Sequence, residues 1–296
     1  MNIIPPAPVE VELFGLPLKL NMVTLFNSWI VIGVLLLLAW AATRNLDLVP
    51  GRLQALCEMI TEFFEDVCIS TLGEKHGRKY MPFIATIFMF VLLSNCIGTL
   101  PGLTCPTQDL NTPLGLTLIV VVVMHVSGIR VNGFKGWLWS FYEPSFPGDR
   151  LSTKIVGALS FLGGCALYYY LLKTYITGWP VMAVGARIGF GVLVGLFFLN
   201  LLGVTVVAFQ MGRVPNVLMA PLNFVGELGK GISHPFRLFG NIFGGFVILT
   251  VVGSLILYIG LPPLMNAFFG LFIGLIQAFV FAMLALAYIA VMITEE

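Results

Sequence analysis

The sequence predicts an all-α integral membrane protein with about seven membrane helices. Of its 296 residues, 58% are hydrophobic and only 10% are charged, whereas an average soluble domain has about 25% charged residues. The mean hydropathy is +0.99, and apolar runs recur along the whole chain. The net charge is only +1. This composition excludes a soluble globular enzyme, a disordered protein and a protein that binds nucleic acid through a basic surface.

Seven apolar runs are candidates for the membrane helices, since a spanning helix needs about 20 mainly apolar residues. They lie at residues 23–42, 82–101, 114–129, 155–172, 188–210, 232–259 and 267–292. The last two runs are long enough to cross the bilayer at a tilt. We expect one membrane domain, 1–296, with residues 1–22 as an external N-terminal tail. This tail has acids and prolines where a secretory signal peptide needs a basic region, so the first run is expected to stay in the mature protein.

Residues 52–68 differ from these runs, because their apolar and charged side chains separate at helical spacing. Leu53, Leu56, Ile60 and Phe64 belong to the apolar face. The other face holds Arg52, Gln54, Glu58, Glu62, Glu65 and Asp66. The pattern predicts an amphipathic helix in the membrane interface. The alternative is a helix that packs on a soluble partner.

The basic residues predict the orientation of the chain in the membrane. The loops after the first, third and fifth runs hold 11 of the 15 lysines and arginines, and the opposite side holds 3. The side with more basic residues is cytoplasmic by the positive-inside rule. We therefore expect an external N-terminus and a cytoplasmic C-terminus in the plasma (inner) membrane of a bacterial cell rather than an organelle.

The remaining basic residue, Arg237, is the only formally charged residue between Gly231 and Thr294. Arginine stays protonated in proteins, and its insertion at a helix centre costs about 2.5–3.5 kcal/mol on insertion scales. Glu227 lies ten residues earlier, about 15 Å away along a continuous helix. We therefore expect the counter-charge to come from another subunit. The alternative is an arginine that snorkels to the membrane interface.

The surroundings of Arg237 favour a partner helix. Ser233 and Asn241 lie four residues before and after it, on the same helical face. Gly240 and Gly244 form a GxxxG pattern, and small residues let another helix approach closely.

The last apolar run contains one amide, Gln277, between Asn266 and Glu295. It either lies opposite Arg237, lines a water path or makes a helix–helix hydrogen bond. The five cysteines show no metal-site or disulfide spacing, and the three histidines lie in different segments. We therefore expect no catalytic site, no metal and no cofactor in this chain.

Several linked motifs resemble the F-type ATP synthase subunit a family, the membrane stator subunits beside the rotating c ring. The central motif is SHPFRLFGNIFGG, preceded by PLNFVGELGKGIS. The others are SNCIGTLPG with PTQDLN, GIRVNGFKGWLWSFYEP, and IGLIQAFVFAMLALAY near the C-terminus. The resemblance covers most of the chain.

The resemblance implies an ion-conducting subunit that is not itself an enzyme. Arg237 would oppose an acidic residue of each c subunit and separate two offset half-channels for protons or sodium ions. Ser233, Asn241 and Gln277 would line or position the ion path. The implied partners are the c ring, b-type peripheral stalk subunits, other ATP synthase subunits and membrane lipid, with no nucleic acid.

The resemblance also suggests residues for the two channel mouths. Asp109 and Asn111 would lie near the outer mouth, or Asp109 would make an Asx turn at the start of the third run. Glu227 would lie near the inner mouth or simply pair with Lys230. His234 would relay protons or only hydrogen-bond near the helix start.

The chain departs from the family pattern in two places. Many relatives have a channel carboxylate nine residues after the arginine, where this chain has Phe246, and Gly270 stands at an often polar position. In addition, residues 150–213 resemble an inserted transmembrane hairpin ahead of an ion-translocating helix pair at 221–296. An independent secondary ion transporter is the alternative function, although no internal repeat supports it.

Overall fold

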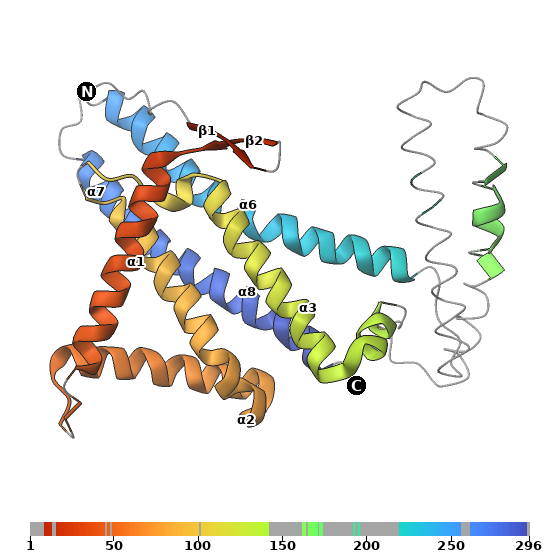
Figure 1. Cartoon of the computed structure of the whole chain (residues 1–296). Coiled ribbons are helices and arrows are strands. Elements are labelled where there is room, and N and C mark those ends of the chain that lie inside the picture. Colours follow the sequence, from red (N-terminus) through yellow and green to blue (C-terminus); the bar gives the residue numbers. More distant parts are fainter. Residues whose placement is uncertain are drawn as a thin grey trace. The chain divides into compact units, whose positions relative to one another are not determined.

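The structure of the chain is a computed structural model. The helices and strands are named below by the labels of Figure 1. The described residues are 9–13, 16–44, 46–47, 49–100, 102–141, 162–163, 165–170, 172–173, 192, 195, 219–255 and 261–294. The chain divides into two compact units. The first unit consists of Met1–Met124 and Gly231–Thr294, and the second of His125–Lys230, with the last two residues divided between them.

Long helices make up most of the described chain. They are α1 (Met22–Thr43), α2 (Arg52–Ile97), α3 (Asn111–Ser140), α6 (Met219–Leu255), α7 (Leu261–Ala267), the π-helical segment η2 (Phe268–Ile273) and α8 (Gly274–Thr294). Five helical stretches within the described residues are long and apolar enough to cross a membrane. This confirms the all-α membrane class. The count of seven stays a prediction, because the runs at 155–172 and 188–210 lie largely outside the described residues.

A short β-hairpin precedes the first helix, where the sequence had suggested only a tail. Strands β1 (Val9–Leu13) and β2 (Leu16–Leu20) pair antiparallel, with Glu10 opposite Lys19. The alternation of apolar and polar residues in VEVEL is the local signal for such a strand. Asn21 caps the start of helix α1, because its Oδ1 accepts a hydrogen bond from the backbone N–H of Val23.

Helix α2 is two helices joined at Gly73, whose φ of 76° is a conformation that favours glycine. Figure 1 shows the first part turned away from the direction of the second. A Cβ at Gly77 would lie only 2.6 Å from the Cα of Ile69. The close packing of the second part of α2 against the first therefore also requires glycine at this position. The second part begins before the apolar run at 82–101, and its exposed Arg78 forms ion pairs with Glu74 and with Glu65 of the first part. Residues 69–81, between the predicted helix at 52–68 and the apolar run at 82–101, are thus helical except for the break at Gly73.

The first part of α2 confirms the helix predicted at 52–68 and extends it to Leu72. Phe64, Cys68 and Leu72 are buried within the chain at a spacing of four residues. Met59 and Phe63 stay exposed. An interfacial membrane layer or a partner would cover these exposed apolar side chains.

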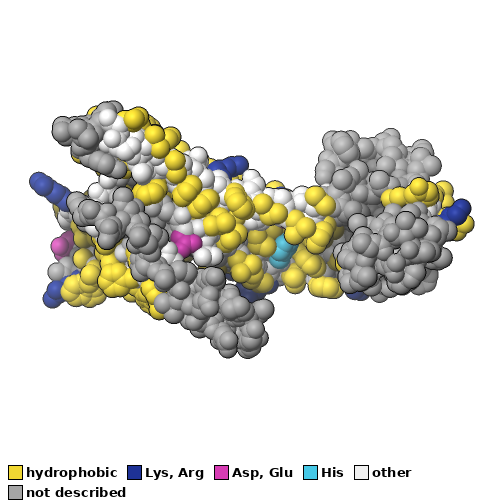
Figure 2. All heavy atoms as spheres, turned by 90° about the horizontal axis from the view of Figure 1, so that it is seen from above, with side chains coloured by type: hydrophobic (Ala, Val, Ile, Leu, Met, Phe, Trp, Pro, Cys, Tyr) yellow, Lys and Arg dark blue, Asp and Glu magenta, His cyan; other side chains and the backbone are white. Residues whose placement is uncertain are grey.

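The core of the first unit lies where α2 packs along α8. Ala278, Ala282 and Ala285 are fully buried on one side of α8, and small residues at this spacing allow close helix packing. Val91 of α2 and Leu286 of α8 are also fully buried. Much of the remaining described surface is hydrophobic, with few charged side chains, as Figure 2 shows from above. This is the surface expected when lipid is the solvent.

Candidate functional site

Arg237 lies on an exposed side of α6, in the first unit. Ser233 and Asn241, one helical turn before and after it, are exposed as well. Among the residues that the structure describes, no carboxylate forms an ion pair with Arg237. The structure therefore brings the three predicted polar residues onto one face and provides no counter-charge from the described part of the chain.

The face of α6 next to Arg237 is fixed by buried contacts with α8. His234 and Leu238 are each only 1% exposed. The Nε2–H of His234 donates to the backbone carbonyl of Phe281 at 3.2 Å, and its ring stacks on that of Phe281 with centroids 3.9 Å apart. The ring of Tyr288 meets it edge-on at 5.5 Å. These contacts set the rotation of α6 and leave the neighbouring Arg237 at the exposed edge of the contact with α8.

Gln277 is half-buried on α8 and lines the same small hollow as Arg237. His234, Leu238 and Phe281 contribute to its walls. The sequence left open whether Gln277 lies near Arg237, and the structure brings the two side chains to one place.

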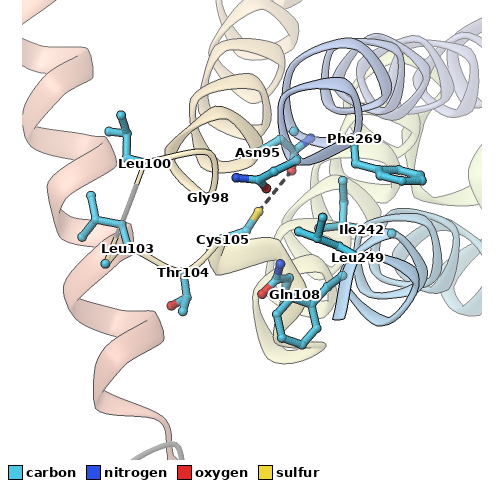
Figure 3. Close-up of a pocket in the computed structure, with 15 residues that line it drawn as sticks. Asn95, Gly98, Leu100, Leu103, Thr104, Cys105, Gln108, Ile242, Leu249 and Phe269 are labelled. Carbon is cyan, nitrogen blue, oxygen red and sulfur yellow. Dashed lines mark hydrogen bonds between the residues drawn. The ribbon is translucent and has the colours of Figure 1, made fainter. Parts of the chain in front are cut away.

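A second polar region lies at the other end of this helix pair. A cavity of about 260 Å³ is lined by the end of α2, the loop after it, α6 and η2, as Figure 3 shows. Asn95, Gln108 and Asn266 contribute amides to its lining. Phe246 and Gly270, the two positions that depart from the family pattern, line it too.

Asn95 is the centre of a buried hydrogen-bond network beside this cavity, and it was missed by sequence reasoning. It is 1% exposed, donates from Nδ2 to the carbonyl of Gly274 at 2.9 Å, and accepts at Oδ1 from Thr107 at 2.6 Å. The Cys105 thiol donates to the carbonyl of Ser94 at 2.8 Å, and burial raises the pKa of this thiol to about 11. An amide inside the apolar run LLSNCIG was the available signal.

Asp109 forms the Asx turn that was one of its two interpretations. Its Oδ1 accepts from the backbone N–H of Asn111 at 3.1 Å. Its Oδ2 accepts from the hydroxyl of Thr24 at 3.0 Å, which ties the start of α3 to α1. Asn111 itself is exposed. The position of both residues at a channel mouth stays a prediction.

Glu227 belongs to the second unit, where it forms an ion pair with Lys230. This is the simpler of its two predicted interactions, and a role at the inner mouth stays a prediction. In the described residues, no group of three or more His, Cys, Asp or Glu side chains is arranged to hold a metal ion. Most of the hairpin predicted at 150–213 lies outside the described residues.

The apolar helices of spanning length define a multi-pass membrane protein. Its face at Ser233, Arg237 and Asn241 is exposed, and Arg237 has no ion-pair partner in the described chain. A family model described as "ATP synthase A chain" matches residues 25–163 and 174–290. The chain therefore belongs to the ATP synthase A chain family, and it is a membrane subunit of the ATP synthase complex.

Curated relatives agree with this assignment. "ATP synthase subunit a" of Desulforamulus reducens is 27% identical, over 94% of this chain and 82% of the relative. The protein of the same name from Moorella thermoacetica is 28% identical, over 96% and 95%. "ATP synthase subunit a 3" of Pelobacter propionicus is 30% identical, over 88% and 83%. This membership leaves the alternative of an independent secondary transporter without support.

Proposed function

We propose that this chain is the ion-conducting stator subunit of a rotary F-type ATP synthase, with two offset half-channels that pass protons or sodium ions to and from a c ring. The observation that carries the proposal is the exposed guanidinium of Arg237, which has no ion-pair partner in the described chain and lies between Ser233 and Asn241. Gly240 and Gly244 have nothing within 4 Å of an added Cβ, so a partner helix has room to approach this face.

Arg237 acts on the ion-binding carboxylate of the ring through its charge. A positive charge nearby favours the ionised carboxylate and typically lowers its pKa by about 1–3 units. The ring site therefore releases its proton or sodium ion as it reaches Arg237, and it takes up the next ion from the other half-channel after it has passed. The fixed cation also opposes direct passage of a cation between the two half-channels.

The membrane potential supplies the driving force for this exchange. A potential of 100 mV is worth about 2.3 kcal/mol for each elementary charge that crosses. Because the half-channels are offset, each ion crosses only by riding on the turning ring. The subunit thereby converts ion flow into torque for ATP synthesis, or the reverse during hydrolysis.

The outer half-channel runs through the amide-lined cavity beside Asn95 and Gln108. The amides of Gln108 and Asn266 in its lining can hydrogen-bond water or coordinate a dehydrated cation, while the buried Asn95 holds the cavity wall in place. Asp109 and Asn111 lie near the outer mouth, while Glu227 and Lys230 belong to the inner side. Ser233, Asn241, His234 and Gln277 complete the proposed path.

The proposed topology places the N-terminus outside and the C-terminus in the cytoplasm of a bacterial cell, with the complex in the plasma membrane. The basic residues of the loops support this orientation. The c ring covers the Arg237 face, and b-type peripheral stalk subunits hold the chain against rotation.

Replacement of Arg237 tests the proposal most directly. Arg237→Ala should abolish ATP-driven proton pumping and ATP synthesis in membrane vesicles, because the ring carboxylate loses its counter-charge. The complex should still assemble, since Arg237 has no ion pair in the described chain. Arg130→Ala is a matched control, because Arg130 is exposed and lies on α3. Retained pumping in the Arg237→Ala complex would contradict the proposal.

A further inference from the structure

A cluster in the second unit joins the C-terminal part of α3 to the N-terminal part of α6. Gly133, with a φ of 71°, breaks α3 and lets the chain turn. The rings of Trp137 and His125 then meet edge-on with centroids 5.8 Å apart, and the ring of Phe141 stacks near His125 at 6.4 Å. Asn223 of α6 donates from Nδ2 to the carbonyl of Phe141 at 2.9 Å. The proposed function assigns no role to His125 or Trp137.

Trp137 fixes the tautomer of His125. The indole Nε1–H donates to Nδ1 of His125 at 3.2 Å. Since an indole can only donate, Nδ1 must accept and therefore carries no proton. The proton of the neutral imidazole is then on Nε2, which makes this atom a donor and leaves the ring no free acceptor.

Glu227 has a buried oxygen that needs a donor. Its side chain is 15% exposed, and Oε1 forms the ion pair with Lys230. Its Oε2 is buried and has no hydrogen-bond partner among the described residues. A buried polar atom of this kind requires an explanation, such as an ordered water molecule or an ion. Glu227 lies one helical turn after Asn223, whose hydrogen bond to Phe141 joins this face of α6 to the ring that stacks near His125.

We propose that His125 is a positioning residue whose Nε2–H, through one water molecule, supplies the donor that Glu227 Oε2 lacks. Trp137 keeps that proton on Nε2, and Lys230 occupies the other carboxylate oxygen. Glu227 is thereby held as the ion acceptor of the inner half-channel. His125 does not take the ion itself, because protonation of Nδ1 would break the bond to Trp137. This inference rests on the proposed function.

The test uses the complete ATP synthase complex in inverted membrane vesicles, with ATP-driven proton pumping normalised to assembled complex. His125→Leu removes the donor and should reduce pumping about tenfold, in line with the loss of one hydrogen bond to a charged group. His125→Gln provides an amide N–H and should restore most of the rate. Trp137→Phe keeps an aromatic ring but releases the tautomer, so its rate should fall between the two. His76→Leu, a histidine in α2, is the control and should pump at the wild-type rate.

A double variant separates positioning from a merely structural role. If His125 acts through Glu227, then His125→Leu with Glu227→Gln should pump no more slowly than Glu227→Gln alone. Additive losses, or failure of His125→Gln to restore pumping, would overturn the inference. If His125→Leu does not assemble, the rates of His125→Gln and Trp137→Phe decide the same question, and wild-type pumping by Trp137→Phe would overturn it. Failure of the proposed function can be distinguished from failure of this inference, because only the former would appear as retained pumping in the Arg237→Ala complex.

Discussion

Arg237 and Asn95 each bring a polar side chain into an apolar run, and the fold treats them in opposite ways. Asn95 is buried and satisfied from within the chain, by Thr107 and the carbonyl of Gly274. Arg237 is exposed and makes no ion pair within the described chain. Unsatisfied polar groups are costly in lipid, so a side chain left open on such a helix requires a partner from outside. The comparison separates polar groups that hold the fold together from those available to a second protein.

Replacement of Asn95 should give the largest effect on stability. Asn95→Leu removes the side-chain donor to the carbonyl of Gly274 and the acceptor of the Thr107 hydroxyl, and each buried polar group left unsatisfied costs about 1–3 kcal/mol. We expect the subunit within the purified complex to become protease-sensitive at lower temperature. The exposed Asn111 provides the control Asn111→Leu, which should leave the protease pattern unchanged. Equal protease sensitivity of Asn95→Leu and Asn111→Leu would contradict the view that only the buried amide stabilises the fold.

Two glycines extend the comparison to packing. A Cβ at Gly274 would lie 2.8 Å from Cβ of Asn95, so Gly274→Ala should overpack the core and destabilise the subunit by about 1–3 kcal/mol. A Cβ at Gly240 meets nothing within 4 Å, so Gly240→Ala should leave the thermal stability of the subunit unchanged. Gly240→Ala should nevertheless slow proton pumping, because the added methyl group lies on the face that we propose a partner helix covers.

These glycine variants are compared by protease sensitivity on heating and by pumping rate in the same vesicles. We expect a stability loss in Gly274→Ala alone. A pumping rate in Gly240→Ala equal to that of wild type would show that the Arg237 face does not make a close helix contact.

The smallest expected effect concerns pH. Burial raises the pKa of the Cys105 thiol from 9.0 to about 11. Below pH 9 the thiol is neutral in both the folded and the unfolded chain, and its contribution to stability is fully present. As the pH rises from 9 to about 11, the unfolded chain loses this proton first, so that the contribution is lost. Maleimide labelling of Cys105, followed by mass spectrometry, should stay low from pH 7 to 9 and rise on unfolding. Rapid labelling at pH 7 in the folded complex would contradict the buried network.

Local sequence patterns were sufficient for the helices and for the isolated arginine. The amphipathic helix at 52–68 was predictable because the charges repeat at helical spacing. The breaks at Gly73 and Gly133 were not, because many glycines in this chain adopt ordinary helical angles. The Ser233, Arg237 and Asn241 face was predictable from spacing alone. The Asn95 network was not, since its partners Thr107 and Gly274 lie 12 and 179 residues away.

The sequence by itself determined that most of this protein lies in lipid, and it determined the family and the positions of the described long helices. It also determined that Arg237 is isolated from other charges along the chain. These properties depend on hydropathy, charge and motifs read along the chain, and none needs a distant contact. Only the tertiary structure decided the rotation of α6, through the burial of His234 against Phe281, and the tautomer of His125, through Trp137. Both depend on side chains that meet across separate helical segments. The direction of each hydrogen bond there decides which polar atoms remain available to another partner.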